Sequence, residues 1–382
     1  MGSNNGALRQ FWDALPITGA GLIGPADPGV RRLLRDAAFD RIHKAPGALR
    51  PVVLLAANLL WCVKAVLLTR RAAKALGFGA REAIRQYADV ALLGQLPKDS
   101  HLWRHMLGGP RRPLSSNAFA KIQASVGDAA EREVLTDKLA TAERLVAAGV
   151  PVPVLLAVLP RGADPVLPDG RDLFVKPRRG ARSRHAFAAT GAPDVTRRLR
   201  AALAEDELLV QQRIAVAPEL ADLATDGVPP VLRLVTVREP GGEPFLHSAL
   251  FSIRVPGERP QHVMRALLRV PVSVADGRLS PGYWPGAPES RYAESPWHKA
   301  PIADRALPGF DQAVRAALAA HGAFGGLAMV GWDVILSDAG PVVIEGNGHT
   351  DWLWLTAIAE GAPNAVSLLA LHARWAAHER RD

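Results

Sequence analysis

Three oxygen-bearing side chains near the end of the chain interrupt two short apolar stretches. Asp333 lies in the first stretch, and Glu345 and Asn347 lie in the second. Residues 337–340, Ser-Asp-Ala-Gly, separate the stretches and are typical of a turn, so we expect a β-hairpin. Glu345 and Asn347 are two residues apart and share one face of a strand. Carboxylate and amide oxygens are ligands that Mg²⁺ prefers, which predicts a magnesium site on this hairpin.

The register of the hairpin decides whether these side chains converge. A two-residue loop at Asp338-Ala339 would place Asp333 opposite Ile344 and turn its carboxylate away from Glu345. A metal site therefore requires a longer turn or a β-bulge. The alternative is a surface hairpin whose polar residues face water, which the apolar character of the other positions disfavours.

Two lysines have the type and position to hold phosphate groups. Lys176 ends the apolar stretch that starts at Leu173, and Lys138 lies at the start of a helical pattern over 137–148. A lysine at the end of a strand can hold a phosphate as a point charge. Four arginines follow Lys176 closely, and their guanidinium groups would donate further hydrogen bonds to the phosphate. They are Arg178, Arg179, Arg182 and Arg184.

Strands and helices that could position these residues alternate from residue 136 onward. Residues 1–135 read as mostly helical and contain no comparable motif. The expected later elements are helices over 137–148, 310–321 and about 366–380, and strands over 173–176, 208–214, 231–238, 249–255, 327–336 and 342–345. No glycine-rich dinucleotide fingerprint occurs, so the pattern indicates α/β or α+β rather than a Rossmann fold.

Composition places the chain among globular proteins of the reducing cytoplasm. Of its 382 residues, 22% are charged and 48% are hydrophobic, which is typical of a folded chain of several domains. One cysteine, Cys62, excludes an intramolecular disulfide and a cysteine-based zinc site. The net charge of +9 comes from residues 1–150, which hold 21 Lys and Arg against 12 Asp and Glu, whereas residues 151–382 hold 25 of each.

The most apolar run, Val52–Leu68, lies in this basic part between Arg50 and the pair Arg70-Arg71. It is shorter than the roughly 20 apolar residues that span a membrane. We expect a helix buried in the core, and the alternative is a helix that lies on an anionic membrane surface. We expect the basic helices to face water rather than to bind nucleic acid. We expect a cytoplasmic protein, which would be peripheral at the membrane if the helix over Val52–Leu68 lies on a membrane surface. The sequence gives no indication of the oligomeric state.

The order of the motifs resembles the ATP-grasp superfamily, and most of all its sugar-transfer-associated branch. The resemblance covers roughly residues 136–362 and rests on several short segments. They are Asp137-Lys138, Gly149-Val150-Pro151-Val152-Pro153, Val175-Lys176-Pro177, Val210-Gln211-Gln212-Arg213-Ile214, Leu232-Arg233-Leu234-Val235-Thr236, Asp333 and Glu345-Gly346-Asn347. The sequence departs from the family in its lid loop, which has one glycine, and at Gln211, where an acidic residue is usual.

The resemblance implies an α+β ATP-grasp fold, in which two α+β subdomains clasp ATP, preceded by the mostly helical region. The implied bounds are 1–135 for the helical basic region, 136–215 for the first subdomain with the lid strand and hinge, and 216–382 for the C-terminal subdomain. The implied cofactors are ATP and Mg²⁺. The implied ATP-binding residues are Lys138, Lys176, Gln211, Gln212, Arg213, Ile214 and Glu219, and the implied metal ligands are Asp333, Glu345 and Asn347.

The resemblance also implies catalytic roles for Lys176, Arg233 and Arg254, because the superfamily delivers arginines from these strands to the γ-phosphate and the acyl intermediate. Four further residues are weaker candidates for substrate contact. His349 and Asp351 follow the metal motif, where they touch the substrate or cap the next helix. Arg265 and Arg269 precede a long loop over 280–297 and have the charge to bind an anionic group.

The resemblance implies a carboxylate ligase that forms an acyl-phosphate and then an amide with an amine, in cell-envelope or natural-product biosynthesis. Its partners would be a small-molecule carboxylate and an amine. The first alternative is a small-molecule kinase of the same fold. The second is a non-catalytic ATP-binding scaffold, which the three metal ligands disfavour.

Overall fold

The computed structural model describes residues 47–76, 79–93, 116–168, 172–180, 185–189, 194–258, 266–284, 290–349 and 367–380. Contacts between Cα atoms divide the chain into two compact units. One is formed by Met1–Gly127 with Asp351–Asp382, and the other by Asp128–Thr350. The subdomain bounds expected from the sequence, after residues 135 and 215, stay predictions.

The described part of the first unit is helical, as the sequence predicts. It contains the short 3-10 helix η2 (Gly47–Leu49) and the helices α3 (Arg50–Leu76), α4 (Ala80–Leu93), α6 (Ser116–Ala124) and α12 (Leu368–His378). Buried Trp61 and Ala65 of α3 pack against Val90 of α4, and the Trp61 indole donates to the Val90 carbonyl at 3.0 Å. These contacts hold α3 and α4 together along one side of α3.

The other side of α3 is exposed, so the expectation that the apolar run Val52–Leu68 is buried in the core is wrong for this face. Leu55 is 64% exposed, Leu59 is 62% exposed and Val63 is 56% exposed. Their spacing of four residues places them on one face of the helix. Among the described residues, no helix has the length and apolar character needed to cross a membrane.

The second unit contains a four-stranded antiparallel sheet covered on one face by a helix. The strands lie in the order β1 (Leu155–Leu159), β4 (Leu208–Gln212), β2 (Leu173–Pro177) and β3 (Phe187–Ala188). Alternate residues such as Val175 and Val210 pack against Leu199 and Leu203 of α9 (Val195–Leu203). The opposite face of β2 and β4 carries Lys176, which is thereby turned away from α9.

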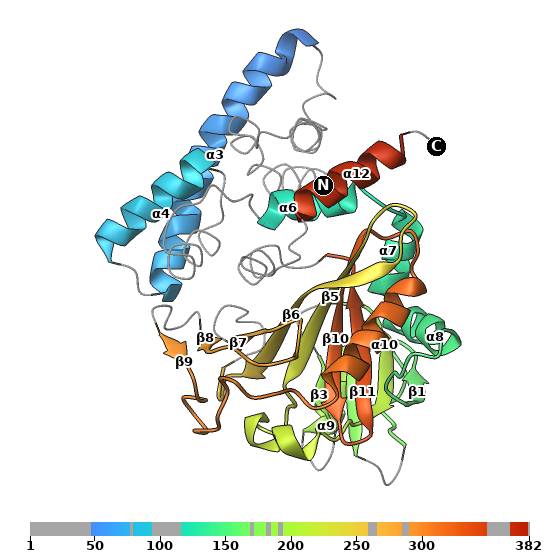
Figure 1. Cartoon of the computed structure of the whole chain (residues 1–382). Helices are drawn as coiled ribbons and strands as arrows, with labels where there is room; N and C mark the ends of the chain where they lie inside the picture. The colour runs from blue at the N-terminus through green and yellow to red at the C-terminus, as the bar shows by residue number, and fades with distance from the viewer. Residues whose placement is uncertain are drawn as a thin grey trace. The chain divides into compact units, whose positions relative to one another are not determined.

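A seven-stranded antiparallel sheet forms the rest of the second unit. Its strands in spatial order are β11 (Gly340–Asn347), β10 (Met329–Ser337), β5 (Val231–Arg238), β6 (Pro244–Arg254), β7 (Leu267–Val272), β8 (Gly282–Tyr283) and β9 (Arg291–Tyr292). Figure 1 shows α10 (Phe310–Gly322) along one face of this sheet. The helices α7 (Ala129–Thr136) and α8 (Lys138–Ala147) and the 3-10 helix η3 (Pro218–Leu223) complete the unit.

The two faces of the seven-stranded sheet differ in chemistry because apolar and polar residues alternate along its strands. Leu234, Phe251 and Trp332 point to the face that packs with α10, where Ala313 and Ala317 are fully buried. The residues between them point to the opposite face, and that face carries Arg233 and Asp333. The alternation therefore places the predicted site residues Arg233 and Asp333 on the face opposite α10.

A buried polar chain lies beneath the predicted metal site. The Trp332 indole donates to Thr236 Oγ1 at 3.0 Å, and His321 Nδ1 lies 2.7 Å from the same oxygen. His321 Nε2 lies 2.8 Å from the Leu327 carbonyl oxygen. Neutral His321 satisfies both contacts by accepting from Thr236 and donating to Leu327. Burial lowers the pKa of His321 from 6.5 to about 4.

Mild acid is expected to destabilise the protein through this histidine. Its pKa is lower in the folded chain than in the unfolded chain, so its contribution to stability is present above pH 6.5 and is lost as the pH falls towards 4. We expect a loss of about 2 kcal/mol from His321 at pH 5. Urea unfolding followed from pH 7.5 to pH 5 measures it. His321→Gln should flatten this pH dependence, and a variant as acid-sensitive as the parent would contradict the assignment.

Candidate active site

The β10–β11 hairpin brings the predicted carboxylates together through a β-bulge. From the turn, the strands pair residue by residue as far as Val334 and Val343, and beyond that point Asp333 lies opposite Glu345. Ile344 is the extra residue on β11 and has no partner of its own on β10. The turn itself is the two-residue loop, so the bulge supplies the change of face that a metal site requires.

Asp333 is held from both neighbouring strands. Arg233 on β5 lies opposite it and forms two hydrogen bonds to its carboxylate, from Nε at 2.5 Å and from Nη2 at 2.8 Å. On β11, the Asn347 amide donates to Asp333 Oδ2 at 3.4 Å. The structure therefore brings Asp333, Glu345 and Asn347 together. It also shows that Arg233, predicted to act on phosphate, neutralises Asp333 here.

Lys176 reaches the hairpin from β2 of the other sheet. Its side chain is 8% exposed, and its Nζ donates to the Ile344 carbonyl at 3.0 Å. The bulge explains this contact, because a residue left out of the strand pairing offers a carbonyl to another donor. Burial lowers the pKa of Lys176 to about 8, against the opposing effect of the Glu345 carboxylate.

Lys138 lies at the start of α8, as the sequence predicts. Asp137 is the N-cap, and its carboxylate accepts from the backbone N–H groups of Leu139 and Ala140 at 3.1 and 3.2 Å. Lys138 Nζ donates to the Gly180 carbonyl at 2.7 Å and lies 3.9 Å from Glu345 Oε1. Two lysines from different elements thus face the hairpin beside Glu345.

Glu345 is the electrostatic centre of this group. Burial raises the pKa of its carboxyl, and the like charge of Asp333 raises it further. Lys138, Lys176 and Arg233 act in the opposite direction. A cation between Asp333 and Glu345 would relieve their repulsion.

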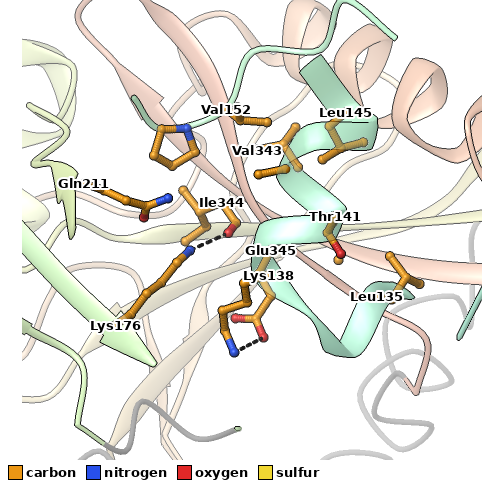
Figure 2. Close-up of a pocket in the computed structure, with 13 residues that line it drawn as sticks. Leu135, Lys138, Thr141, Leu145, Val152, Lys176, Gln211, Val343, Ile344 and Glu345 are labelled. Atoms are coloured by element: carbon orange, nitrogen blue, oxygen red, sulfur yellow. Dashed lines mark hydrogen bonds and ion pairs between the residues drawn. The ribbon is translucent and has the colours of Figure 1, made fainter. Parts of the chain in front are cut away.

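A pocket opens between these elements (Figure 2). Lys138 and Lys176 point towards Ile344 and Glu345, and Gln211 of β4 lies on the Lys176 side. Apolar side chains of α8, of the segment 152–153 and of β11 line the remainder. A pocket with apolar walls, two cations and one amide has the chemistry to hold a base and phosphates.

The remaining hinge residues lie outside this lining. Gln212 is exposed, and its N–H donates to the Val154 carbonyl at 2.9 Å. The Arg213 N–H donates to the Asp172 carbonyl at 2.9 Å, so that donor is already engaged. Ile214 is half-buried, and Glu219 is exposed in η3. Of the predicted base and ribose contacts, Gln211 is therefore the one that the structure places at the pocket.

Ion pairs already occupy two of the arginines that the sequence suggested as hydrogen-bond donors to phosphate. Arg178 pairs with Asp137 at 2.8 Å and with Glu207 at 2.9 Å, and Arg179 pairs with Glu133 at 2.9 Å. The bond to Asp137 ties the end of β2 to the start of α8. Asp137 is 5% exposed and contacts both arginines, a role that the sequence alone does not indicate. The other two arginines of the loop, Arg182 and Arg184, lie outside the described residues.

The weaker substrate candidates are scattered. His349 is exposed two residues beyond Asn347. Asp351 and Arg265 lie outside the described residues. Arg269 of β7 donates to Ser252 Oγ of β6 at 3.0 Å, and Arg254 ends β6.

The residues at the hairpin fit a magnesium ion that is shared with a nucleotide. Among the described residues, no group of three or more His, Cys, Asp or Glu is placed to hold a metal. Asp333 and Glu345 are two carboxylates, and Asn347 adds an amide oxygen. Magnesium is commonly bound by one or two carboxylates together with phosphate oxygens and water. This donor set fits that pattern.

Comparison with known proteins identifies a family for part of the chain. Residues 187–369 match the family model described as sugar-transfer associated ATP-grasp. The match includes β10, β11 and the strands that carry Arg233 and Arg254, and it confirms the resemblance found in the sequence. No curated protein matches this chain.

Solved structures with partial likeness include two ligases and a biotin carboxylase. An L-amino acid ligase from Bacillus licheniformis is 14% identical, with a TM-score of 0.38, and the alignment covers 66% of this chain and 46% of that one. Biotin carboxylase from Campylobacter jejuni is 13% identical, with a TM-score of 0.47, and the alignment covers 68% of this chain and 51% of that one. D-alanine–D-alanine ligase from Bacillus anthracis is 14% identical, with a TM-score of 0.42, and the alignment covers 67% of this chain and 71% of that one. The chain spans about half the length of the first two.

Proposed function

We propose that this chain, whose residues 187–369 match the sugar-transfer-associated ATP-grasp family, is an ATP- and magnesium-dependent carboxylate–amine ligase. The observation that carries the proposal is the convergence of Lys138 and Lys176 on Glu345 beside Asp333. The arrangement supports the proposal because two cations suited to phosphate lie next to two carboxylates suited to Mg²⁺ at one pocket. Amide formation in cell-envelope or natural-product biosynthesis is the reaction that we propose.

In the proposed mechanism, Lys138 and Lys176 bind the phosphates of ATP and Gln211 hydrogen-bonds the adenine. Asp333, Glu345 and Asn347 would hold Mg²⁺, which supplies charge neutralisation at the phosphoryl group when it is bound. The γ-phosphoryl group passes to an oxygen of the substrate carboxylate, and ADP leaves. The amine then attacks the acyl carbon, inorganic phosphate leaves, and the amine loses a proton. Lys176, already desolvated, stabilises the charge that develops on the phosphoryl oxygens.

Product analysis separates this proposal from its alternatives. A ligase releases ADP and phosphate together with an adduct when acid and amine are both present. A kinase of the same fold gives ADP and a stable phosphorylated product without an amine. A scaffold binds ATP and gives neither product. An ATP-dependent product that forms with the acid alone and persists in the presence of amines would replace the ligase proposal with the kinase one.

The exposed face of α3 supports a second proposal, peripheral contact with an anionic membrane. The stripe formed by Leu55, Leu59 and Val63 continues into exposed Arg70 and Lys74 on the same face of the helix. The sequence of α3 contains no acidic residue. Two copies packed through this face in parallel would bring like charges together, whereas an anionic lipid surface complements both the leucines and the basic residues.

Binding to lipid vesicles tests this second proposal. We expect the chain to sediment with phosphatidylcholine vesicles that contain phosphatidylglycerol, and salt to reduce the bound fraction. Leu59→Glu should weaken the binding several-fold. Ile84→Glu alters an apolar residue of α4 that is 70% exposed, and it serves as the matched control. Absence of sedimentation at low salt, or equal binding to vesicles of phosphatidylcholine alone, would refute the proposed contact with an anionic membrane.

A further inference from the structure

Gln211 brings a side-chain amide to one end of the pocket. The residue lies in β4 between β1 and β2, where Leu155 and Phe174 are its direct cross-strand partners. It is 4% exposed and contributes to the pocket wall. Pairing of β4 on both sides fixes the backbone at this position, so the amide is presented to the pocket from a rigid element.

The order of groups along the pocket separates the place of a base from the place of the phosphates. Figure 2 shows the ammonium group of Lys176 between Gln211 and Glu345. Lys138 lies on the Glu345 side, 3.9 Å from that carboxylate. Phosphates held by the two lysines therefore lie towards Glu345, which leaves the Gln211 side for the base. Val152 belongs to the same pocket wall and offers an apolar surface to a flat ring.

The Gln211 amide can both donate and accept hydrogen bonds, and it does neither within the described part of the chain. Its Oε1 is an acceptor, and its Nε2 carries two donors. A buried amide without a partner costs free energy, and a ligand that bonds to it removes this cost. Burial in the pocket wall without a protein partner indicates that this amide contacts the ligand.

The backbone groups that follow Gln211 are less able to select a base. The Gln212 N–H donates to the Val154 carbonyl and the Arg213 N–H donates to the Asp172 carbonyl, both at 2.9 Å. These two donors are engaged within the protein and are not available to a ligand. The choice of base therefore depends strongly on the Gln211 side chain.

An amide at this position suits both purines. Adenine presents an exocyclic amino group, which is a donor, where guanine presents an exocyclic oxygen, which is an acceptor. Rotation of the Gln211 amide by about half a turn exchanges its two ends, so Oε1 accepts from adenine and Nε2 donates to guanine. A carboxylate in the same place would only accept, and it would face the guanine oxygen without a proton between the two atoms.

We propose that Gln211 reads the purine base in both forms, so that the chain uses GTP as well as ATP. The proposal rests on the ligase function proposed above and names the class of its phosphoryl donor, a purine nucleoside triphosphate. With GTP, the γ-phosphoryl group passes to the same oxygen of the substrate carboxylate, and GDP leaves in place of ADP. Gln211 sets specificity in this role and takes no part in the phosphoryl transfer.

Calorimetric titration of the full chain with ADP and with GDP, each with Mg²⁺ at pH 7.5, tests the proposal without turnover. We expect the two dissociation constants to agree within about 10-fold. Gln211→Glu should weaken the binding of GDP relative to ADP about 10- to 100-fold, because a buried acceptor would then face another acceptor. Gln211→Leu removes the amide and should weaken the binding of both nucleotides about 10-fold.

Gln312→Glu is the matched control, because it makes the same change at an exposed position of α10 and should leave the ratio of the two affinities unchanged. Unfolding midpoints establish that each variant is folded. Inorganic pyrophosphate is titrated as well, because it carries phosphates without a base. Pyrophosphate that binds as tightly as ADP, or a ratio that Gln211→Glu does not change, would overturn the reading of the base by Gln211.

The outcomes separate this proposal from the ligase function. Binding of ADP together with GDP binding that is more than about 10-fold weaker in the parent chain would overturn the use of GTP and leave the ligase function standing. Failure of both nucleotides to bind would overturn both proposals. Nucleotide binding as expected in a chain that forms no product from acid and amine would contradict the ligase function and leave the base selectivity standing.

Discussion

Replacing Lys176 or Glu345 with alanine is expected to reduce ATP turnover by at least about 1,000-fold, the order seen when a group that stabilises transition-state charge is removed. Lys176 is the buried cation that holds the bulge carbonyl of Ile344, and Glu345 is the carboxylate that faces both lysines. Steady-state phosphate release by the purified variants measures the effect. Glu143→Ala, an exposed position on α8, is the control and should turn over ATP like the parent.

Stability separates this functional loss from simple misfolding. A lysine whose pKa falls from 10.5 to about 8 on folding lowers the stability of the chain at neutral pH by an amount on the order of 3 kcal/mol. Lys176→Met removes that charge and keeps the length of the side chain. We expect its unfolding midpoint to equal or exceed that of the parent while its turnover is lost. An inactive variant that is also strongly destabilised would assign Lys176 a structural role, and unchanged turnover would refute the site.

Substitution of Gly346 is expected to damage both the fold and the site. Gly346 lies opposite Trp332, between Glu345 and Asn347. An added Cβ would lie 2.6 Å from Trp332 Cζ3 and 2.8 Å from Leu135 Cδ2. Neither side chain has room to move, because Trp332 is fully buried and Leu135 is 5% exposed. Gly346→Ala should therefore shift β11 and destabilise the chain by about 1–3 kcal/mol.

The same shift should lower ATP turnover by about 100-fold, since a displacement near 1 Å at a reacting centre has an effect of this order. Gly348→Ala is the matched control. Its added Cβ would meet Arg132 Cγ at 3.5 Å, which is an ordinary contact. Thermal unfolding and phosphate release are measured for both variants. A Gly346→Ala protein with normal stability and turnover would show that the packing of Trp332 does not set the position of the metal ligands.

Local patterns were sufficient to predict the elements that carry the site. The alternation of β5, the helical spacing before Gly149 and the turn at residues 337–340 each predict the element that the structure contains. The hairpin also illustrates how chemistry constrains register. Asp333 and Glu345 can form one site only if a residue is inserted between the turn and the site, and Ile344 is that residue.

Long-range pairing could not be predicted in the same way. The partners of Arg178 and Arg233 are Asp137 and Asp333, which lie 41 and 100 residues away in the sequence. A lone sequence shows that an arginine is near a motif and does not show which carboxylate reaches it first. The exposed face of α3 has a related cause, because a helix that is apolar all round indicates burial and only the packing of α4 shows which side is covered.

Transfer of oxygen from the acid to phosphate tests the central claim most directly. The carboxylic acid that supports phosphate release in the presence of an amine is labelled with ¹⁸O in its carboxyl group, and the phosphate formed from ATP is analysed by mass spectrometry. Activation as an acyl-phosphate predicts that one labelled oxygen appears in each phosphate released and that Glu345→Ala abolishes the transfer. Phosphate that forms at the normal rate and contains no label would contradict the account.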